Sequence, residues 1–346
     1  MTGIAPVPLA QIRRRRGADV KRVALTIDGK KIEVPEGTTI LAACATIGVE
    51  IPTLCFLETL RPVNVCRICV VEVKGARVLV PSCSRAVEPG MEVLTNSKRV
   101  RHSRKLILEM LASSVDLSAT PKVAGWMAEY GAKPERYGRR APAAAAGARD
   151  ALVPGHHAPP VAGYAATVAQ PAKVDNDLYV RDYAKCILCY KCVEACGPEH
   201  QNTFAIAVAG RGFDARISTE FAAPLPDSAC VYCGNCIAVC PTGALMAKTE
   251  FDMRAAGTWD ESKQTATDTI CPYCGVGCTL TLHVQDGEIV KATTPLDNDI
   301  TVGNLCIKGR FGWQFVKGAA KGAGVPAAAM QGASAAAGNG RANGGR

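Results

Sequence analysis

The residues with the clearest chemistry in this sequence are its cysteines. The chain has 346 residues and 17 cysteines, which fall into three blocks at positions 44–83, 186–240 and 271–306. The basic run at 13–16 is not followed by the apolar stretch of an export signal, so we expect a reducing, cytoplasmic location. In such a compartment, clustered thiols are typical of metal sites rather than of disulfides. The three blocks therefore predict metal centres.

The first block has the spacing Cys55-x10-Cys66-x2-Cys69-x13-Cys83. The plant-type [2Fe–2S] pattern has a four-residue first gap and the same two-residue second gap. With its longer first gap, the block resembles the N-terminal domain of the large iron–sulfur subunit of respiratory complex I, which implies that these four thiolates hold a [2Fe–2S] cluster. A structural zinc site is the alternative, because four cysteines also satisfy tetrahedral Zn²⁺. Cys44 lies on the apolar face of a predicted helix and is expected in the core.

The second block is an internal repeat of two C-x2-C-x2-C-x3-C runs, which begin at Cys186 and Cys230. The repeat is similar to the two-cluster bacterial ferredoxins, in which the fourth cysteine of each run binds the other cluster. The resemblance implies two [4Fe–4S] clusters, and we expect a strand pair in the long spacer between the runs. Their ligands would be Cys186, Cys189, Cys192 and Cys240 for one cluster, and Cys196, Cys230, Cys233 and Cys236 for the other.

The third block is C-x2-C-x3-C at Cys271, Cys274 and Cys278, followed by Cys306. A hairpin is predicted between Cys278 and Cys306, around a turn at 286–287. The block resembles the first domain of molybdopterin-dependent oxidoreductases, formate dehydrogenases above all. That resemblance implies a third [4Fe–4S] cluster, with Lys308 as an electron relay between cluster and pterin. A zinc ribbon is the alternative.

Two features of the family are missing. A His and three Cys often hold a further cluster after the first domain, but residues 111–120 contain neither residue type. Only 40 residues follow Cys306, whereas a molybdopterin enzyme needs several hundred more to enclose its cofactor. We therefore expect the active site on a separate subunit. Neither a dinucleotide-binding nor a P-loop motif is present, so flavin and NAD are also expected on a partner.

Together the predicted elements give an α+β fold. An N-terminal β-grasp [2Fe–2S] ferredoxin-like domain is followed by a two-cluster bacterial-ferredoxin-like domain and a small β-rich [4Fe–4S] domain of molybdopterin-oxidoreductase type. The predicted divisions are a disordered basic arm (1–21), the [2Fe–2S] domain (22–96), a helical extension (97–140), an Ala/Pro/Gly linker (141–175), the two-cluster domain (176–256), the last [4Fe–4S] domain (266–316) and a disordered Ala/Gly tail (317–346).

The resemblance covers residues 22–316 and implies an iron–sulfur electron-transfer subunit, not catalytic alone. It would connect a molybdopterin, formate-oxidising subunit to a flavin- and NAD-binding iron–sulfur subunit, like the N-terminal half of an NAD-linked molybdenum or tungsten formate dehydrogenase. Three alternatives are a subunit of another NAD-linked complex (a hydrogenase or a complex I relative), a fragment of a longer single-chain enzyme, and a zinc-stabilised binding module. Despite a net charge of +9, no nucleic-acid motif is present, and no apolar run is long enough to span a membrane.

Overall fold

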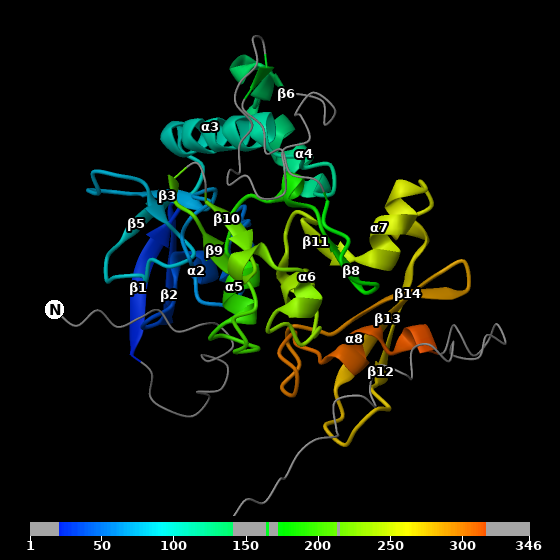
Figure 1. Ribbon diagram of the computed structural model, residues 1–346. Helices are drawn as coiled ribbons and strands as arrows, with labels where there is room; N and C mark the ends of the chain where they lie inside the picture. The colour runs from blue at the N-terminus through cyan, green and yellow to red at the C-terminus, as the bar shows by residue number, and fades with distance from the viewer. Residues whose placement is uncertain (1–20, 141–163, 166–171, 213–214, 316–346) are drawn as a thin grey trace, which may run out of the picture.

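The computed structural model describes residues 21–140, 164–165, 172–212 and 215–315. All but the last residue of the predicted basic arm, most of the predicted linker and all of the predicted tail lie outside these residues. Figure 1 shows the N-terminal sheet in blue, the middle of the chain in green and the last sheet in orange. The green helices α5 (Lys191–Cys196) and α6 (Asn235–Val239) lie between the two sheets in this view.

The N-terminal part is a five-stranded mixed sheet with one helix packed on its core. The strand order is β2-β1-β5-β3-β4, with β1 parallel to β5 and the other neighbours antiparallel. A hairpin turn at Asp28 and Gly29, both with positive φ, joins the first two strands. The elements are β1 (Arg22–Ile27), β2 (Lys30–Pro35), α2 (Ile40–Thr46), β3 (Val70–Val73), β4 (Val80–Pro81) and β5 (Glu92–Leu94).

A helical region follows this sheet. Helix α3 (Lys98–Ser114) begins after the N-cap Ser97, whose side chain accepts the Val100 N–H, and α4 (Pro121–Tyr130) ends at the left-handed Gly131. Both helices lie within the stretch 97–140 where a helical extension was predicted. The short elements nearby are η1 (Pro134–Tyr137), β6 (Arg139–Arg140) and β7 (Tyr164–Ala165).

The middle of the chain packs α5 against α6, beside two short strand pairs. The pair β9 (Ala207–Ala209) and β10 (Arg216–Ser218) is antiparallel and lies in the spacer where a strand pair was predicted. The other elements are β8 (Tyr179–Arg181), which pairs with β11 (Leu245–Ala247), and the turns η2 (Tyr183–Lys185), η4 (Glu220–Ala222) and η5 (Leu225–Asp227).

The last part is a three-stranded antiparallel sheet in the order β12-β13-β14. The predicted hairpin is confirmed as β13 (Thr279–Gln285) and β14 (Glu288–Thr293), whereas the edge strand β12 (Thr265–Ile270) was not predicted. All six residues of β12 are exposed, so it carries no alternating apolar pattern. The remaining elements are α7 (Lys248–Ala255), η6 (Glu261–Lys263) and α8 (Ile307–Phe311).

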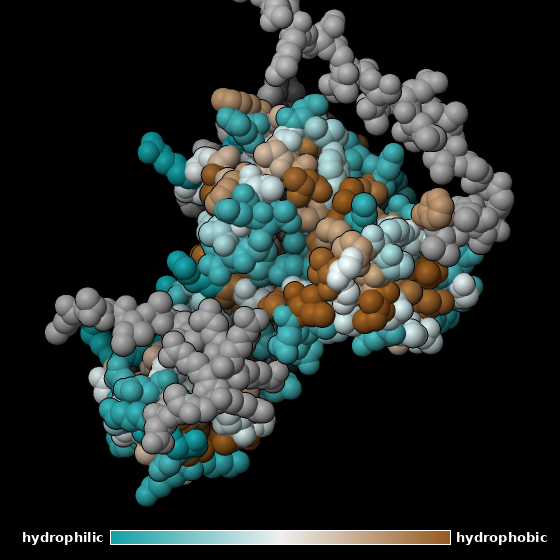
Figure 2. Space-filling view, turned by 90° about the horizontal axis from the view of Figure 1, so that it is seen from below, coloured by the Kyte–Doolittle hydropathy of each residue, from teal (hydrophilic) through white to brown (hydrophobic). Residues whose placement is uncertain are grey.

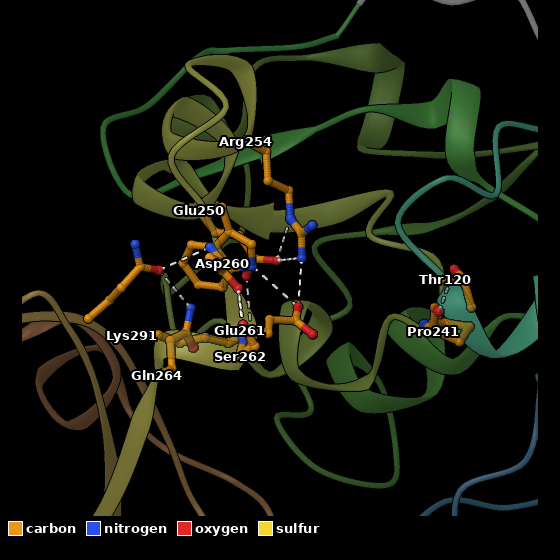
Figure 3. A network of polar contacts seen from close by, with 11 residues as sticks. Thr120, Pro241, Glu250, Arg254, Asp260, Glu261, Ser262, Gln264 and Lys291 are labelled. Carbon is orange, nitrogen blue, oxygen red and sulfur yellow. Dashed lines mark hydrogen bonds and ion pairs between the residues drawn. The ribbon is translucent and has the colours of Figure 1, made fainter.

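A polar network joins the middle of the chain to this last sheet (Figure 3). Glu250 on α7 accepts hydrogen bonds from Arg254 Nη2 at 2.8 Å and from Lys291 Nζ on β14 at 3.0 Å. Arg254 Nη2 also donates to Glu261 at 2.8 Å. Because the Glu250 side chain is buried and both cations are partly covered, the network fixes α7 against β14.

Candidate metal centres

The cysteines of the first block come together on the loops beside the five-stranded sheet. Cys69 Sγ and Cys83 Sγ are 3.4 Å apart, and Cys83 Sγ donates to Asn64 Oδ1 at 3.2 Å. Cys55, Cys69 and Cys83 are buried, and Cys66 is partly exposed. The four predicted ligands therefore lie close together, and each offers a sulfur atom to a metal.

Two thiols of this group are set up to ionise. The hydrogen bond that Cys66 shares with Cys55 lowers the pKa of Cys66 to about 6, and the one that Cys69 shares with Cys83 lowers the pKa of Cys69 to about 7. The thiolate is the form that binds metals. Cys44 behaves in the opposite way, since burial raises its pKa to about 12 and its side chain lies in the core of the sheet. Cys44 is a core residue, as predicted.

The first predicted cubane site surrounds a small cavity. Cys186, Cys189, Cys192 and Cys240 all line it, together with apolar side chains that include Ile187 and Leu245. The Leu188 N–H points at Cys186 Sγ, 3.4 Å away. Cys240 belongs to the second run of the repeat, so the structure brings together the exchanged set that the ferredoxin resemblance implies. The apolar lining surrounds the sulfurs with a medium of low polarity, which tunes a metal centre.

The second predicted cubane site also brings its four cysteines together, although all four are partly exposed. Burial raises the pKa of Cys236, and the neighbouring Cys233, Cys196 and Cys230 raise it further, so these four thiols form one electrostatic group. The Tyr179 hydroxyl lies 2.8 Å from Cys230 Sγ.

The backbone repeats as well as the cysteines. In both cysteine loops, the second residue after the first Cys has positive φ, and so does the residue directly after the second Cys. These positions are Leu188 and Tyr190 in the first run and Tyr232 and Gly234 in the second. Two equivalent loops therefore present three closely spaced sulfurs each.

The third cysteine block forms the most exposed group. Burial raises the pKa of Cys278, and the nearby Cys271, Cys274 and Cys306 add to the rise, which places the four predicted ligands together. Cys274 and Cys306 are exposed, and Lys308 is exposed on α8 two residues later. Five exposed apolar side chains belong to the same part of the chain: Ile270, Tyr273, Val276, Ile307 and Phe315. Figure 2 shows hydrophobic side chains gathered on the right of the view from below, the side on which Figure 1 draws β12 and α8.

The residues at the four groups fit iron–sulfur clusters by their donor chemistry. Each group offers four cysteine sulfurs, the donor set that [2Fe–2S] and [4Fe–4S] clusters take. Among the described residues, no three or more His, Cys, Asp or Glu side chains are arranged to hold a single metal ion. The assignment of individual cysteines to individual clusters stays a prediction.

The four groups are also neighbours in space. The charge of Cys66 in the first group acts on Cys189 in the second group, so these two groups adjoin. The charge of Cys236 in the third group acts on Cys192 in the second group, so these two adjoin as well. The side chain of Arg310 interacts with both Cys236 and Cys306, which connects the third group to the fourth.

The sequence did not reveal two buried cations at these junctions. Lys191 is buried, and burial lowers its pKa. The thiols of both neighbouring groups oppose this shift: Cys189 and Cys240 on one side, and Cys55 and Cys66 on the other. Arg310 is likewise buried. Lysine and arginine are usually exposed, so their residue type does not predict burial. Only a sequence pattern that links these two positions to the cysteine loops could have identified them.

Comparison with known proteins identifies the domains. Residues 20–98 match the 2Fe-2S iron-sulfur cluster binding domain, residues 185–244 the 4Fe-4S dicluster domain, and residues 264–318 the Molybdopterin oxidoreductase Fe4S4 domain. The chain is built from three iron–sulfur domains. The predicted fold class is thereby confirmed, and with it the presence of both a [2Fe–2S]-type domain and [4Fe–4S]-type domains.

Two relatives and one solved structure are similar to this chain. The alpha subunit of an NADPH-Fe(3+) oxidoreductase from Geobacter sulfurreducens is 33% identical over 303 residues, which are 85% of this chain and 31% of the relative. The subunit HndD of an NADP-reducing hydrogenase from Solidesulfovibrio fructosivorans is 37% identical over 229 residues, 65% of this chain and 36% of that subunit. The chain thus spans about a third of the length of these relatives.

The solved structure is an NAD+-reducing [NiFe]-hydrogenase in the H2-reduced state. It matches with a TM-score of 0.51 and 24% identity, over 65% of this chain and 87% of that chain. At this identity the likeness supports the fold. In the part of the chain that the structure describes, no helix has the length and apolar character needed to cross a membrane.

Proposed function

We propose that this chain is an iron–sulfur electron-transfer subunit of an NAD(P)-linked oxidoreductase complex. One observation carries the proposal: the four groups of thiols form a row in which each group is near enough to the next for their charges to interact. A row of separate zinc sites would need no such contact, whereas electron transfer between centres depends on their proximity. The names of the similar NADPH- and NADP-linked proteins agree with this reading.

The proposed cofactors are one [2Fe–2S] cluster and three [4Fe–4S] clusters. The first would bind Cys55, Cys66, Cys69 and Cys83, and the three cubanes would bind the sets 186/189/192/240, 196/230/233/236 and 271/274/278/306. Each cluster takes up and gives away one electron. The chain buries most of the thiols of the first two groups and points N–H groups at sulfur, as Leu188 and Tyr232 do.

The exposed end of the row is the proposed docking site for a catalytic partner. Cys274, Cys306 and Lys308 are all exposed there, within an apolar surface that would be covered in a complex. We propose that a molybdopterin subunit binds this surface, that Lys308 lies between its pterin and the last cluster, and that formate is its substrate. The formate assignment rests on the resemblance of the third cysteine block.

At the opposite end, a flavin- and NAD-binding partner would receive electrons from the [2Fe–2S] cluster. Val65, in the loop that carries the predicted ligands of this cluster, is exposed. The cytoplasm, where thiols stay reduced, is the proposed compartment. A hydrogenase partner in place of the molybdopterin subunit is the second candidate, favoured by the similarity to the hydrogenase subunit.

The experiment is to isolate the complex through a tag on this chain and to compare it with a Cys274→Ser variant. The proposal expects a molybdopterin partner, formate-dependent NAD reduction in the parent, and its loss in the variant while formate oxidation by an artificial dye persists. Cys44→Ser is the matched control and should retain NAD reduction. Undiminished NAD reduction in the Cys274 variant would contradict the proposed order of the centres, and a nickel-containing partner would favour the hydrogenase.

A further inference from the structure

The junction between the third and fourth groups of thiols contains one buried cation. Arg310 lies on α8, four residues after Cys306, and only 5% of its surface is exposed. Its guanidinium reaches into the other domain, where Nε donates to the Cys233 carbonyl at 2.9 Å and Nη2 donates to Asn235 Oδ1 at 3.1 Å. Asn235 Oδ1 also accepts the Leu305 N–H at 3.1 Å, so both sides of the junction share one acceptor.

Arg310 packs closely against the loop that it enters. Gly234 has a φ of +70°, and a Cβ added there would lie 2.2 Å from Arg310 Cδ and 2.9 Å from its Nε. The next residue, Phe311, belongs to the core of the two-cluster domain and stacks on Tyr179 with 6.2 Å between ring centroids. The side chain is therefore held in place by the domain that it enters.

The charge of this residue is not balanced by a carboxylate. Its hydrogen bonds go to two neutral oxygens, and none of the Asp and Glu side chains in the described ranges forms an ion pair with it. The groups that act on its charge are Cys233, Cys236 and Cys306. An arginine guanidinium stays protonated at neutral pH, so this charge is present in the folded chain. A buried, unpaired charge is costly, so a compensating anion is needed nearby.

We propose that Arg310 is a positioning residue that fixes the domain of the 196/230/233/236 cubane against that of the 271/274/278/306 cubane and supplies the positive charge shared by both. The inference rests on the proposed function, because both groups are taken to hold clusters, and the cluster anions are then the missing counter-charge. One-electron reduction adds a negative charge to a cluster, which a fixed cation stabilises. Arg310 therefore raises the reduction potentials of both clusters and keeps the transfer distance constant.

The test uses the full chain, purified without oxygen, and three variants. Arg310→Gln removes the charge, Arg310→Lys keeps the charge but not the two-pronged hydrogen bonding, and Lys308→Gln is the matched control. Lys308 lies on the same short helix and carries the same charge, but it is exposed to water, which screens it. Iron content is measured first, and each cluster is then titrated with dithionite and redox mediators while its paramagnetic resonance signal is recorded.

For Arg310→Gln, we expect both midpoint potentials to fall by at least the equivalent of a tenfold change in the equilibrium for reduction, about 59 mV for one electron. Lys308→Gln should leave the 196/230/233/236 cluster unchanged. Unmoved midpoints in a fully loaded Arg310→Gln chain would overturn the inference. A parent chain without clusters would instead contradict the proposed function itself.

If the Arg310→Gln chain loses iron, its midpoint potentials no longer test the inference, and the Arg310→Lys variant is used instead. It should keep the parent potentials, because the charge remains, while the magnetic coupling between the two clusters weakens as the junction loosens. Parent-like coupling in this variant would overturn the positioning role.

Discussion

A methyl group added at Gly234 tests the packing between the two-cluster domain and α8. Gly234 has a φ of +70°, a left-handed conformation that costs a non-glycine residue about 1–2 kcal/mol. Its new Cβ would also lie 2.2 Å from Arg310 Cδ and 3.2 Å from the ring of Phe311. Overpacking of this kind adds about 1–3 kcal/mol. Gly234→Ala should therefore destabilise the protein by about 2–5 kcal/mol in total.

The chain provides a matched control at Gly257. Its φ is also +70°, but a Cβ there meets nothing within 4 Å. Gly257→Ala should therefore cost only the conformational part, about 1–2 kcal/mol. The difference between the two variants measures the contact with Arg310 and Phe311, free of the backbone penalty that both share.

The assay is thermal unfolding of the loaded chain at one fixed scan rate, since large cofactor proteins often unfold irreversibly. Gly234→Ala should unfold at a clearly lower temperature than Gly257→Ala. Combining Gly234→Ala with Arg310→Ala should lower the unfolding temperature by less than the sum of the two single changes, because the contact between the new Cβ and Arg310 is then absent. Equal unfolding temperatures for the two glycine variants would refute the close packing on which the junction depends.

Three further predictions concern other sites. Cys44→Ala should leave the iron content unchanged and lower the free energy of unfolding by about 1 kcal/mol, whereas Cys69→Ala should lose the iron of one centre. Equal iron loss in both variants would contradict the assignment of Cys44 to the core. Glu250→Gln should lower stability by about 1 kcal/mol, seen as a lower unfolding temperature, because its cationic partners are partly solvated; no change would argue that the network of Figure 3 does not hold α7. Burial opposes ionisation of Glu109, but the Lys133 N–H and Arg136 outweigh it and lower its pKa below the ordinary 4.5. Its contribution to stability should be complete above pH 4.5 and disappear as the pH falls through the lowered folded value. The stability difference between parent and Glu109→Gln, measured from pH 8 downward, should shrink in the same range, and a constant difference would contradict this.

Much of the local structure could be predicted because its signals are local. The helix after Thr39, the helix after Ser97 and the turn at Asp28 and Gly29 each depend on a cap or a turn residue within a few positions. The cysteine groups were also predictable, since their spacing is itself the pattern. The exchanged position of Cys240 came from the ferredoxin resemblance, and the structure brings it beside Cys186, Cys189 and Cys192.

The remaining features depend on contacts that the sequence does not display. Strand β12 is exposed on both faces, so it lacks the apolar alternation that marks a half-buried strand. Arg310 becomes a junction residue only because α8 packs on a loop more than seventy positions earlier in the chain. The sequence drew attention to Lys308, which is exposed, and not to the buried arginine two residues later.

The most direct test of the central claim is the iron content and the low-temperature paramagnetic resonance spectrum of the reduced, anaerobically purified chain. One [2Fe–2S] and three [4Fe–4S] clusters require about 14 iron atoms per chain. Because the four groups of thiols adjoin one another, the reduced centres should show signals broadened by magnetic coupling. A colourless, zinc-loaded protein, or iron centres whose signals are independent of one another, would contradict the account.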